Sequence, residues 1–141
     1  MPEAYPDHLE AGTQNIVGIA ALNAGIQYVQ SHQKEIVEKE CFLLQKLYEG
    51  LSGYVDFYSS LENSTPIVAI NIPGKDSAYV SDLLNYKYGI VTRCGAHCAP
   101  LMHKHLKTEE RGIVRLSISF QNTIEDVYFV VRAIQKISND Y

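Results

Sequence analysis

The stretch Gly112–Phe120, "GIVRLSISF", is the clearest β-strand in the sequence. Its apolar and polar residues alternate and divide between two faces, with Val114, Leu116, Ile118 and Phe120 on one face and Arg115, Ser117 and Ser119 on the other. Such alternation is typical of a strand that has one face on a core and the other face free. The stretch therefore predicts a sheet that helices cover on one side.

Helices and further strands surround this stretch. The next residues, "NTIED", place Thr123 and Asp126 at the spacing of a capping box, which predicts a helix from there towards the C-terminus. Periodicity and composition predict the remaining elements, namely helices over 13–30, 33–50 and 77–88, a short helix after Pro100, and strands over 54–58, 67–72 and 90–93. Helices and strands mix without strict βαβ alternation. We therefore expect an α+β fold with a small, mostly antiparallel sheet covered by helices.

Length and composition exclude several classes of protein. The 141 residues suffice for one domain with its own core, and a net charge of -4 gives no reason to expect nucleic acid as a partner. No apolar run approaches membrane-spanning length. An odd count of 3 cysteines and no recognisable signal peptide favour free thiols in a reducing cytoplasm.

The stretch "TRCGAHCAPLMHKH", from Thr92 to His105, concentrates cysteine and histidine. A zinc site needs four ligands, usually in two separated pairs, and here all the candidates lie in one segment, so we expect no metal. Cys98 instead follows His97 and lies near Arg93, and positive charge beside a thiol favours a reactive nucleophile. A buried structural cysteine beside a loop histidine is the alternative.

Two further places in the sequence could bind a ligand. Gly12 and Thr13 stand directly before a predicted helix, where backbone N–H groups and the helix dipole suit a phosphate, although Thr13 could equally be a helix cap. Arg115, on the polar face of its strand, presents a fork that suits a carboxylate. Arg93 also lies in a predicted strand, so the sheet could bring the two arginines together. A salt-bridged surface arginine is the alternative.

Three stretches together resemble the C-terminal part of class V aminotransferase-like enzymes, which use pyridoxal phosphate (PLP) and have fold type I. They are "LEAGTQNIVGIAALNAGIQYV", "YGIVTRCGAHCAPLMHKHLKT" and "GIVRLSISFQNTIEDV", and they are most similar to cysteine desulfurases and selenocysteine lyases. The resemblance implies that Cys98 takes sulfur or selenium from the PLP-bound substrate as a persulfide, with His97 beside it. Arg115 would grip the carboxylate of a cysteine-like substrate, and Arg93 would line the same pocket.

The resemblance also implies a cofactor contact and a dimer. Gly12 and Thr13 would reach across a homodimer interface to the partner's PLP phosphate, although Gln14 replaces the proline that usually follows them. The lysine that binds PLP, in a Ser-x-His-Lys context, has no match here, and His103-Lys104 is only an echo of it. We therefore expect residues 1–12 to be an arm and residues 13–141 the small C-terminal domain, inactive without a large PLP-binding domain. Another PLP aminotransferase or lyase, and a non-catalytic interaction module, remain alternatives.

Overall fold

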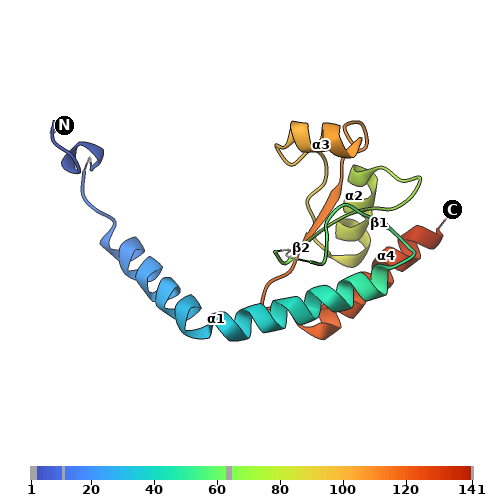
Figure 1. Cartoon of the computed structure of the whole chain (residues 1–141), viewed down its shortest axis with the longest axis horizontal. Coiled ribbons are helices and arrows are strands. Elements are labelled where there is room, and N and C mark those ends of the chain that lie inside the picture. Colours follow the sequence, from blue (N-terminus) through green and yellow to red (C-terminus); the bar gives the residue numbers. More distant parts are fainter. Residues whose placement is uncertain (1–2, 11, 63–64, 141) are drawn as a thin grey trace. The chain divides into compact units, whose positions relative to one another are not determined.

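The structure is a computed structural model that describes residues 3–10, 12–62 and 65–140. The chain divides into two compact units, residues 1–36 and residues 37–141, and the predicted boundary at residue 12 falls inside the first. The elements are η1 (Asp7–Leu9), α1 (Ile16–Leu51), β1 (Asp56–Phe57), β2 (Ile67–Asn71), α2 (Ser77–Tyr88), α3 (Pro100–Leu106), β3 (Val114–Ser117) and α4 (Ile124–Asn139). Figure 1 shows them along the chain.

The sheet lies in the second unit and has the order β1-β2-β3, with both pairs antiparallel. The predicted strand over 112–120 is shorter than expected and covers Val114–Ser117, with Val114 and Leu116 buried. The predicted strand over 90–93 is wrong as a strand, because that segment forms only an isolated bridge at Arg93. The α+β class with a small antiparallel sheet is confirmed.

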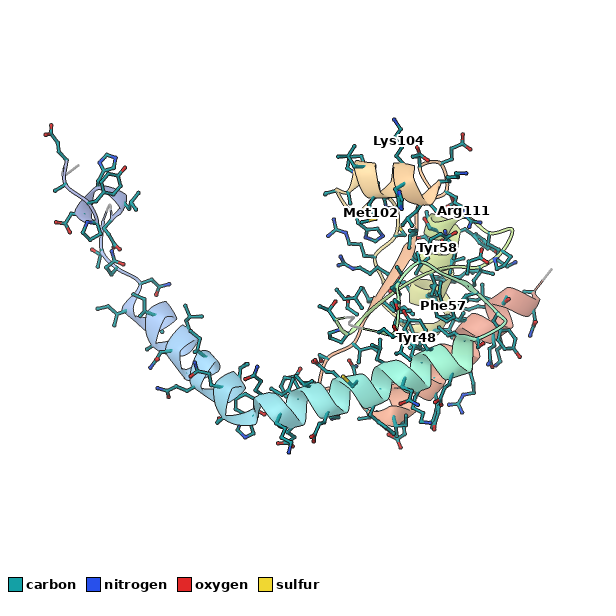
Figure 2. All side chains as sticks on the ribbon, in the orientation of Figure 1. Tyr48, Phe57, Tyr58, Met102, Lys104 and Arg111 are labelled. Carbon is teal, nitrogen blue, oxygen red and sulfur yellow. The ribbon has the colours of Figure 1, made fainter. Side chains whose placement is uncertain are left out.

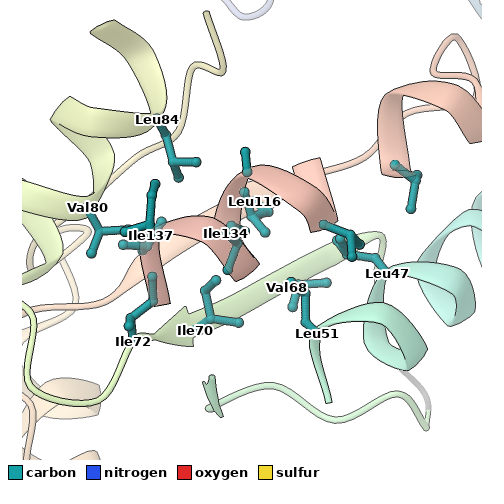
Figure 3. Packing of buried hydrophobic residues seen from close by; sticks show 14 of the residues in the cluster. Leu47, Leu51, Val68, Ile70, Ile72, Val80, Leu84, Leu116, Ile134 and Ile137 are labelled. Carbon is teal, nitrogen blue, oxygen red and sulfur yellow. The ribbon is translucent and has the colours of Figure 1, made fainter. Parts of the chain in front are cut away.

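Helices cover one face of this sheet and bury its apolar side chains (Figure 3). Val68 and Ile70 of β2 and Val114 of β3 are fully buried at the centre of this core. The C-terminal part of α1 contributes Leu43, Leu44, Leu47 and Leu51, α2 contributes Val80 and Leu84, and α4 contributes Val127, Val131, Ala133, Ile134 and Ile137. Since side chains alternate along a strand, Ala69 and Arg115 lie on the opposite face of the sheet, which carries the polar residues.

The first helix is longer than the sequence predicts. Two helices were expected over 13–30 and 33–50, whereas α1 runs from Ile16 to Leu51 without a break. The expected break fell at Ser31, but its hydroxyl donates to the carbonyl oxygens of Gln27 and Tyr28 at 2.8 and 3.0 Å. A serine that bonds back to the preceding turn is compatible with a continuing helix.

Close packing and caps fix the other helices. A Cβ atom on Gly50 of α1 would lie 2.7 Å from Val131 Cγ2, so the missing side chain lets α1 and α4 approach each other. In α4 the predicted capping box is confirmed, with Thr123 and Asp126 bonded in both directions. The carboxylate of Asp76 caps α2, and Gly89 ends that helix with a φ of 67°.

The first unit carries an apolar face on α1 that no described residue covers. Ile16, Ile19 and Leu22 are exposed by 73%, 56% and 65%. Gly25 was expected to allow close backbone packing, yet nothing among the described residues lies within 4 Å of a Cβ placed there. The predicted apolar stripe is therefore present on the helix, whereas the close packing expected at Gly25 is not seen among the described residues.

Candidate active site

The backbones of Arg93 and Arg115 meet on the polar side of the second unit. The two residues form an antiparallel bridge, in which Arg93 N donates to Arg115 O at 3.3 Å and Arg115 N donates to Arg93 O at 2.7 Å. The sequence left open whether the sheet would bring the two arginines together. It does so through this single bridge, which stands in place of the predicted strand over 90–93.

The segment after Arg93 turns sharply at His97 and Cys98. Ala99 N donates to Ala96 O at 2.9 Å, and the two residues between them have φ values of 51° and 57°. Two successive positive φ values are those of a type I′ turn, where glycine and asparagine are the usual residues. For other residues this conformation is strained, and it persists only when the surroundings enforce it. Cys98 thus lies at the tip of a strained, exposed turn.

The turn brings the thiol of Cys98 to the side chain of Arg93. Arg93 Nη2 donates to Cys98 Sγ at 3.8 Å, a distance within the range of hydrogen bonds to sulfur. Cys98 is exposed, so a reagent or substrate can reach its sulfur from outside. Cys94 is half-buried and Cys41 is exposed, and all three thiols are free.

His97 is held by one of its ring nitrogens. Its Nε2 lies 2.9 Å from the carbonyl oxygen of Ile113, and because a carbonyl only accepts, Nε2 must carry the proton. In the neutral ring Nδ1 then has a free lone pair. That atom is buried and has no hydrogen-bond partner among the described residues. His97 therefore offers one unused acceptor beside Cys98.

Arg115 has an unused donor. Its Nε atom is buried and lacks a hydrogen-bond partner in the part of the chain that the structure describes. No ion pair joins either Arg93 or Arg115 to a described carboxylate. A guanidinium with a free donor suits a carboxylate, which it can bind through two parallel hydrogen bonds.

Arg111, in contrast, is already paired. Its Nη2 donates to Tyr58 Oη and, at 3.4 Å, to Asp56 Oδ2, which ties the segment before β3 to β1 (Figure 2). The hydrogen bond from Arg111 to Tyr58 is the main cause that raises the pKa of Arg111 above its ordinary value. Arg111 therefore serves the fold, whereas Arg115 remains available.

Two glycines and a buried asparagine anchor the loop that carries Cys98. A Cβ atom on Gly112 would lie 2.6 Å from Gly95 Cα, so the two backbones touch. Asn71, only 1% exposed, donates from Nδ2 to the carbonyl oxygen of Gly112 at 2.8 Å. Sequence reasoning missed these residues, because nothing in a pattern of polar and apolar residues marks Asn71 at a strand end.

Gly12 and Thr13 belong to the first unit, whereas the residues described above belong to the second. Both are exposed, and Gly12 has a φ of 91°. One interpretation of the sequence made Thr13 the cap of α1, and it is wrong. Asn15 caps the helix instead, and its Oδ1 accepts a hydrogen bond from Gly18 N at 2.9 Å.

Among the described residues, no group of three or more His, Cys, Asp or Glu gathers to hold a metal ion. Within the same residues, no helix is long and apolar enough to cross a bilayer. A groove between the end of α2, β3 and α4, lined by Ile90, Leu116 and Phe129, lies away from Cys98.

Comparison with known proteins identifies the family. The family model described as aminotransferase class-V matches residues 2–130. The chain belongs to this family. A probable cysteine desulfurase of Methanothermobacter thermautotrophicus is 32% identical to the class-V chain, and the match covers 96% of the class-V chain. A cysteine desulfurase of Klebsiella pneumoniae is 34% identical, and that match covers 94% of the class-V chain.

Solved structures agree with this assignment. The apo structure of a cysteine desulfurase from Thermococcus onnurineus matches 94% of the class-V chain with a TM-score of 0.83 and 31% identity. The chain spans about a third of the length of these relatives, with 35% of the first curated one and 34% of the solved one covered. The fold is thus that of one part of a class-V enzyme.

Proposed function

We propose that the chain is the small domain of a PLP-dependent cysteine desulfurase, in which Cys98 takes sulfur from cysteine. The observation that carries the proposal is the contact of 3.8 Å between Arg93 Nη2 and Cys98 Sγ, next to the Arg93–Arg115 bridge. A nucleophilic thiol and a free arginine fork are the two groups that an amino-acid substrate with a sulfur atom and a carboxylate requires. The same reaction is supported by two relatives, a probable cysteine desulfurase and a cysteine desulfurase, that match nearly the whole chain.

The residues present fit one edge of a PLP site. Gly12 has no side chain and a left-handed φ, which allows a ligand to approach the backbone closely, and the exposed hydroxyl of Thr13 follows it. These two residues would contact the phosphate, from one subunit of a homodimer to the other. When bound, PLP supplies the electron sink that lets the bond between carbon and sulfur break. We also propose that a large PLP-binding domain completes the enzyme and that the enzyme acts in the cytoplasm.

The residues of the second unit then have distinct tasks. Arg115 binds the carboxylate of the substrate, and Arg93 keeps positive charge beside the sulfur of Cys98. The thiolate of Cys98 forms a bond to the substrate sulfur while the bond from that sulfur to carbon breaks. The electron pair stays with carbon, which takes up a proton to give alanine, and Cys98 keeps the sulfur as a persulfide. No external oxidant or reductant is needed. His97 accepts or holds a proton at Nδ1.

A chimera tests this function. The matched third of the Methanothermobacter relative is replaced by this chain, and the PLP-loaded protein is incubated with cysteine. We expect alanine in equal amount to the sulfide released after reduction, and a mass increase of one sulfur atom on the peptide that contains Cys98. The Cys98→Ser chimera should lose both. A folded, PLP-loaded chimera that forms a keto acid instead would indicate an aminotransferase, and one that forms no product would refute the proposal.

A non-catalytic pairing module is the second candidate, and one observation favours it. The exposed apolar face of α1, with Ile16, Ile19 and Leu22, needs a partner in water. Sedimentation of the isolated chain over a hundredfold range of concentration tests this candidate. Association that Leu22→Glu abolishes would support it, and a monomer at every concentration would count against it.

A further inference from the structure

His103 is a buried polar residue close to the proposed nucleophile. It is 3% exposed and is the one buried residue of α3. Its Nδ1 shares a hydrogen bond of 2.9 Å with Oγ1 of Thr108, which is 1% exposed. A buried imidazole with a fixed hydrogen-bond partner has little freedom to rotate. Residue type and spacing do not distinguish His103 from its exposed neighbour His105.

The ring of His103 packs against the ring of His97. The ring centroids are 5.9 Å apart and the planes differ by 13°, which is a stacked arrangement. His97 is thereby held on two sides, by the His103 ring and by the carbonyl oxygen of Ile113. Because Cys98 follows His97 directly, a held His97 ring restrains the backbone from which the thiol extends.

The strain in the turn explains why such support is needed. His97 and Cys98 both adopt positive φ values, which are unfavourable for residues other than glycine. Without contacts that enforce it, the turn would relax to ordinary backbone angles and Cys98 would move away from Arg93. The stack on His103 is a side-chain contact that can enforce this conformation.

We propose that His103 is a positioning residue, whose buried ring supports His97 and so holds the thiol of Cys98 beside Arg93. The inference rests on the proposed function for its importance, since the position of Cys98 matters only if Cys98 reacts. The physical claim concerns the chain itself, and it needs neither PLP nor substrate. Its test is therefore independent of the chimera experiment.

The test measures how fast iodoacetamide alkylates Cys98 in the isolated chain. Cys41→Ser and Cys94→Ser remove the other thiols, and mass spectrometry follows the peptide that contains Cys98. Positive charge beside a thiol favours the reactive thiolate. Losing the contact with Arg93 should therefore slow alkylation roughly two- to fivefold, a factor that corresponds to the usual strength of an exposed charge pair. His103→Ala should show this loss. His103→Phe keeps a flat ring and should restore the rate.

A double-mutant cycle tests whether His103 affects alkylation through the contact between Arg93 and Cys98. In an Arg93→Gln background, His103→Ala should slow alkylation no further, because the contact that His103 maintains is already gone. His105→Ala, an exposed change on the same helix, is the matched control and should react like the parent. Circular dichroism verifies the fold of each variant, and His103→Leu replaces His103→Ala if the latter is unfolded.

Four outcomes would overturn the proposal. The first is a folded His103→Ala or His103→Leu variant that reacts at the parent rate, and the second is a His103→Phe variant that reacts as slowly as His103→Ala. The third is an effect of His103→Ala that persists in the Arg93→Gln background. The fourth is a His105→Ala variant that slows alkylation as much as His103→Ala. A chimera without desulfurase activity would refute the proposed function and leave this result intact.

Discussion

Arg93 and Arg115 lie directly opposite each other and exchange both backbone hydrogen bonds, at 3.3 and 2.7 Å. Residues that face each other in an antiparallel pair direct their side chains to the same side of the sheet. The bridge thus places two arginine side chains on the same side of the sheet, and neither forms an ion pair with a described carboxylate. Such an arrangement suits an anionic ligand and costs stability when no anion is bound.

Replacing Arg93 should stabilise the chain. Like charges directly opposite in a sheet are destabilising, so Arg93→Gln should raise the free energy of unfolding by about 0.2–0.5 kcal/mol at low salt. Urea denaturation measures the change. The gain should shrink in 0.5 M sodium chloride, because salt screens exposed charges, and a gain that is independent of salt would exclude repulsion as the cause.

Glycine at position 98 should be more stable than alanine. Cys98 has a φ of 57°, which glycine adopts without steric cost, although glycine loses more backbone entropy on folding. We expect Cys98→Gly to exceed Cys98→Ala by about 0.5–1 kcal/mol in the free energy of unfolding. Thermal and urea denaturation of both variants provide the comparison. Equal stability would mean that the turn is not strained at this residue.

Gly112 should tolerate no side chain. Gly112→Ala combines a positive φ of 63° with contacts to Gly95 Cα and Ser77 Oγ at 2.6 and 2.7 Å, and should cost about 2–4 kcal/mol. Gly74→Ala is the matched control, since Gly74 has a φ of 75° and nothing within 4 Å, and it should cost about 1 kcal/mol. Urea denaturation separates the two. Similar losses would show that the contact between the glycines is unimportant.

Asp126 should make stability depend on pH in the acid range. The hydrogen bond from Thr123 N is the main cause that lowers the pKa of Asp126 below its ordinary value of 3.8. A lowered pKa in the folded chain means that the contribution is present above pH 3.8 and is lost as the pH falls below that value through the folded pKa.

Unfolding by urea at several pH values between 5 and 2 checks this dependence. The chain should lose stability on acidification more steeply than Asp126→Asn, which cannot titrate at this position. Glu110→Gln removes an exposed carboxylate of the loop between α3 and β3 and should leave the steep loss unchanged. Parallel curves for the chain and Asp126→Asn would contradict the assignment.

Local patterns predicted the parts of the fold that local chemistry determines. The alternation in "GIVRLSISF" predicted which face of β3 is buried, and the spacing of Thr123 and Asp126 predicted the capping box. The break expected near Ser31 was wrong, because a side chain that could leave the helix instead bonds back to it. The helix cap considered at Thr13 was also wrong, because Asn15 caps α1 instead.

The candidate site was less predictable, because most of its geometry depends on tertiary contacts. The sequence singled out Cys98, His97, Arg93 and Arg115 by residue type and by resemblance. It could not show that Arg93 reaches both Arg115 and Cys98, since this depends on a single bridge and a turn with positive φ values. The support from His103 and Asn71 was equally hidden, because burial distinguishes them and local spacing does not.

The exposed tip of the turn and its buried anchors have different evolutionary freedom. The anchors, Asn71, Gly112 and His103, are tied to the core and constrain one another. The side chain at position 98 extends outward, and its replacement disturbs no packed layer. Under the proposed function, substitutions there would change which reaction the fold supports at almost no expense in foldability. A lineage would then acquire or discard sulfur chemistry through one codon while the scaffold persists.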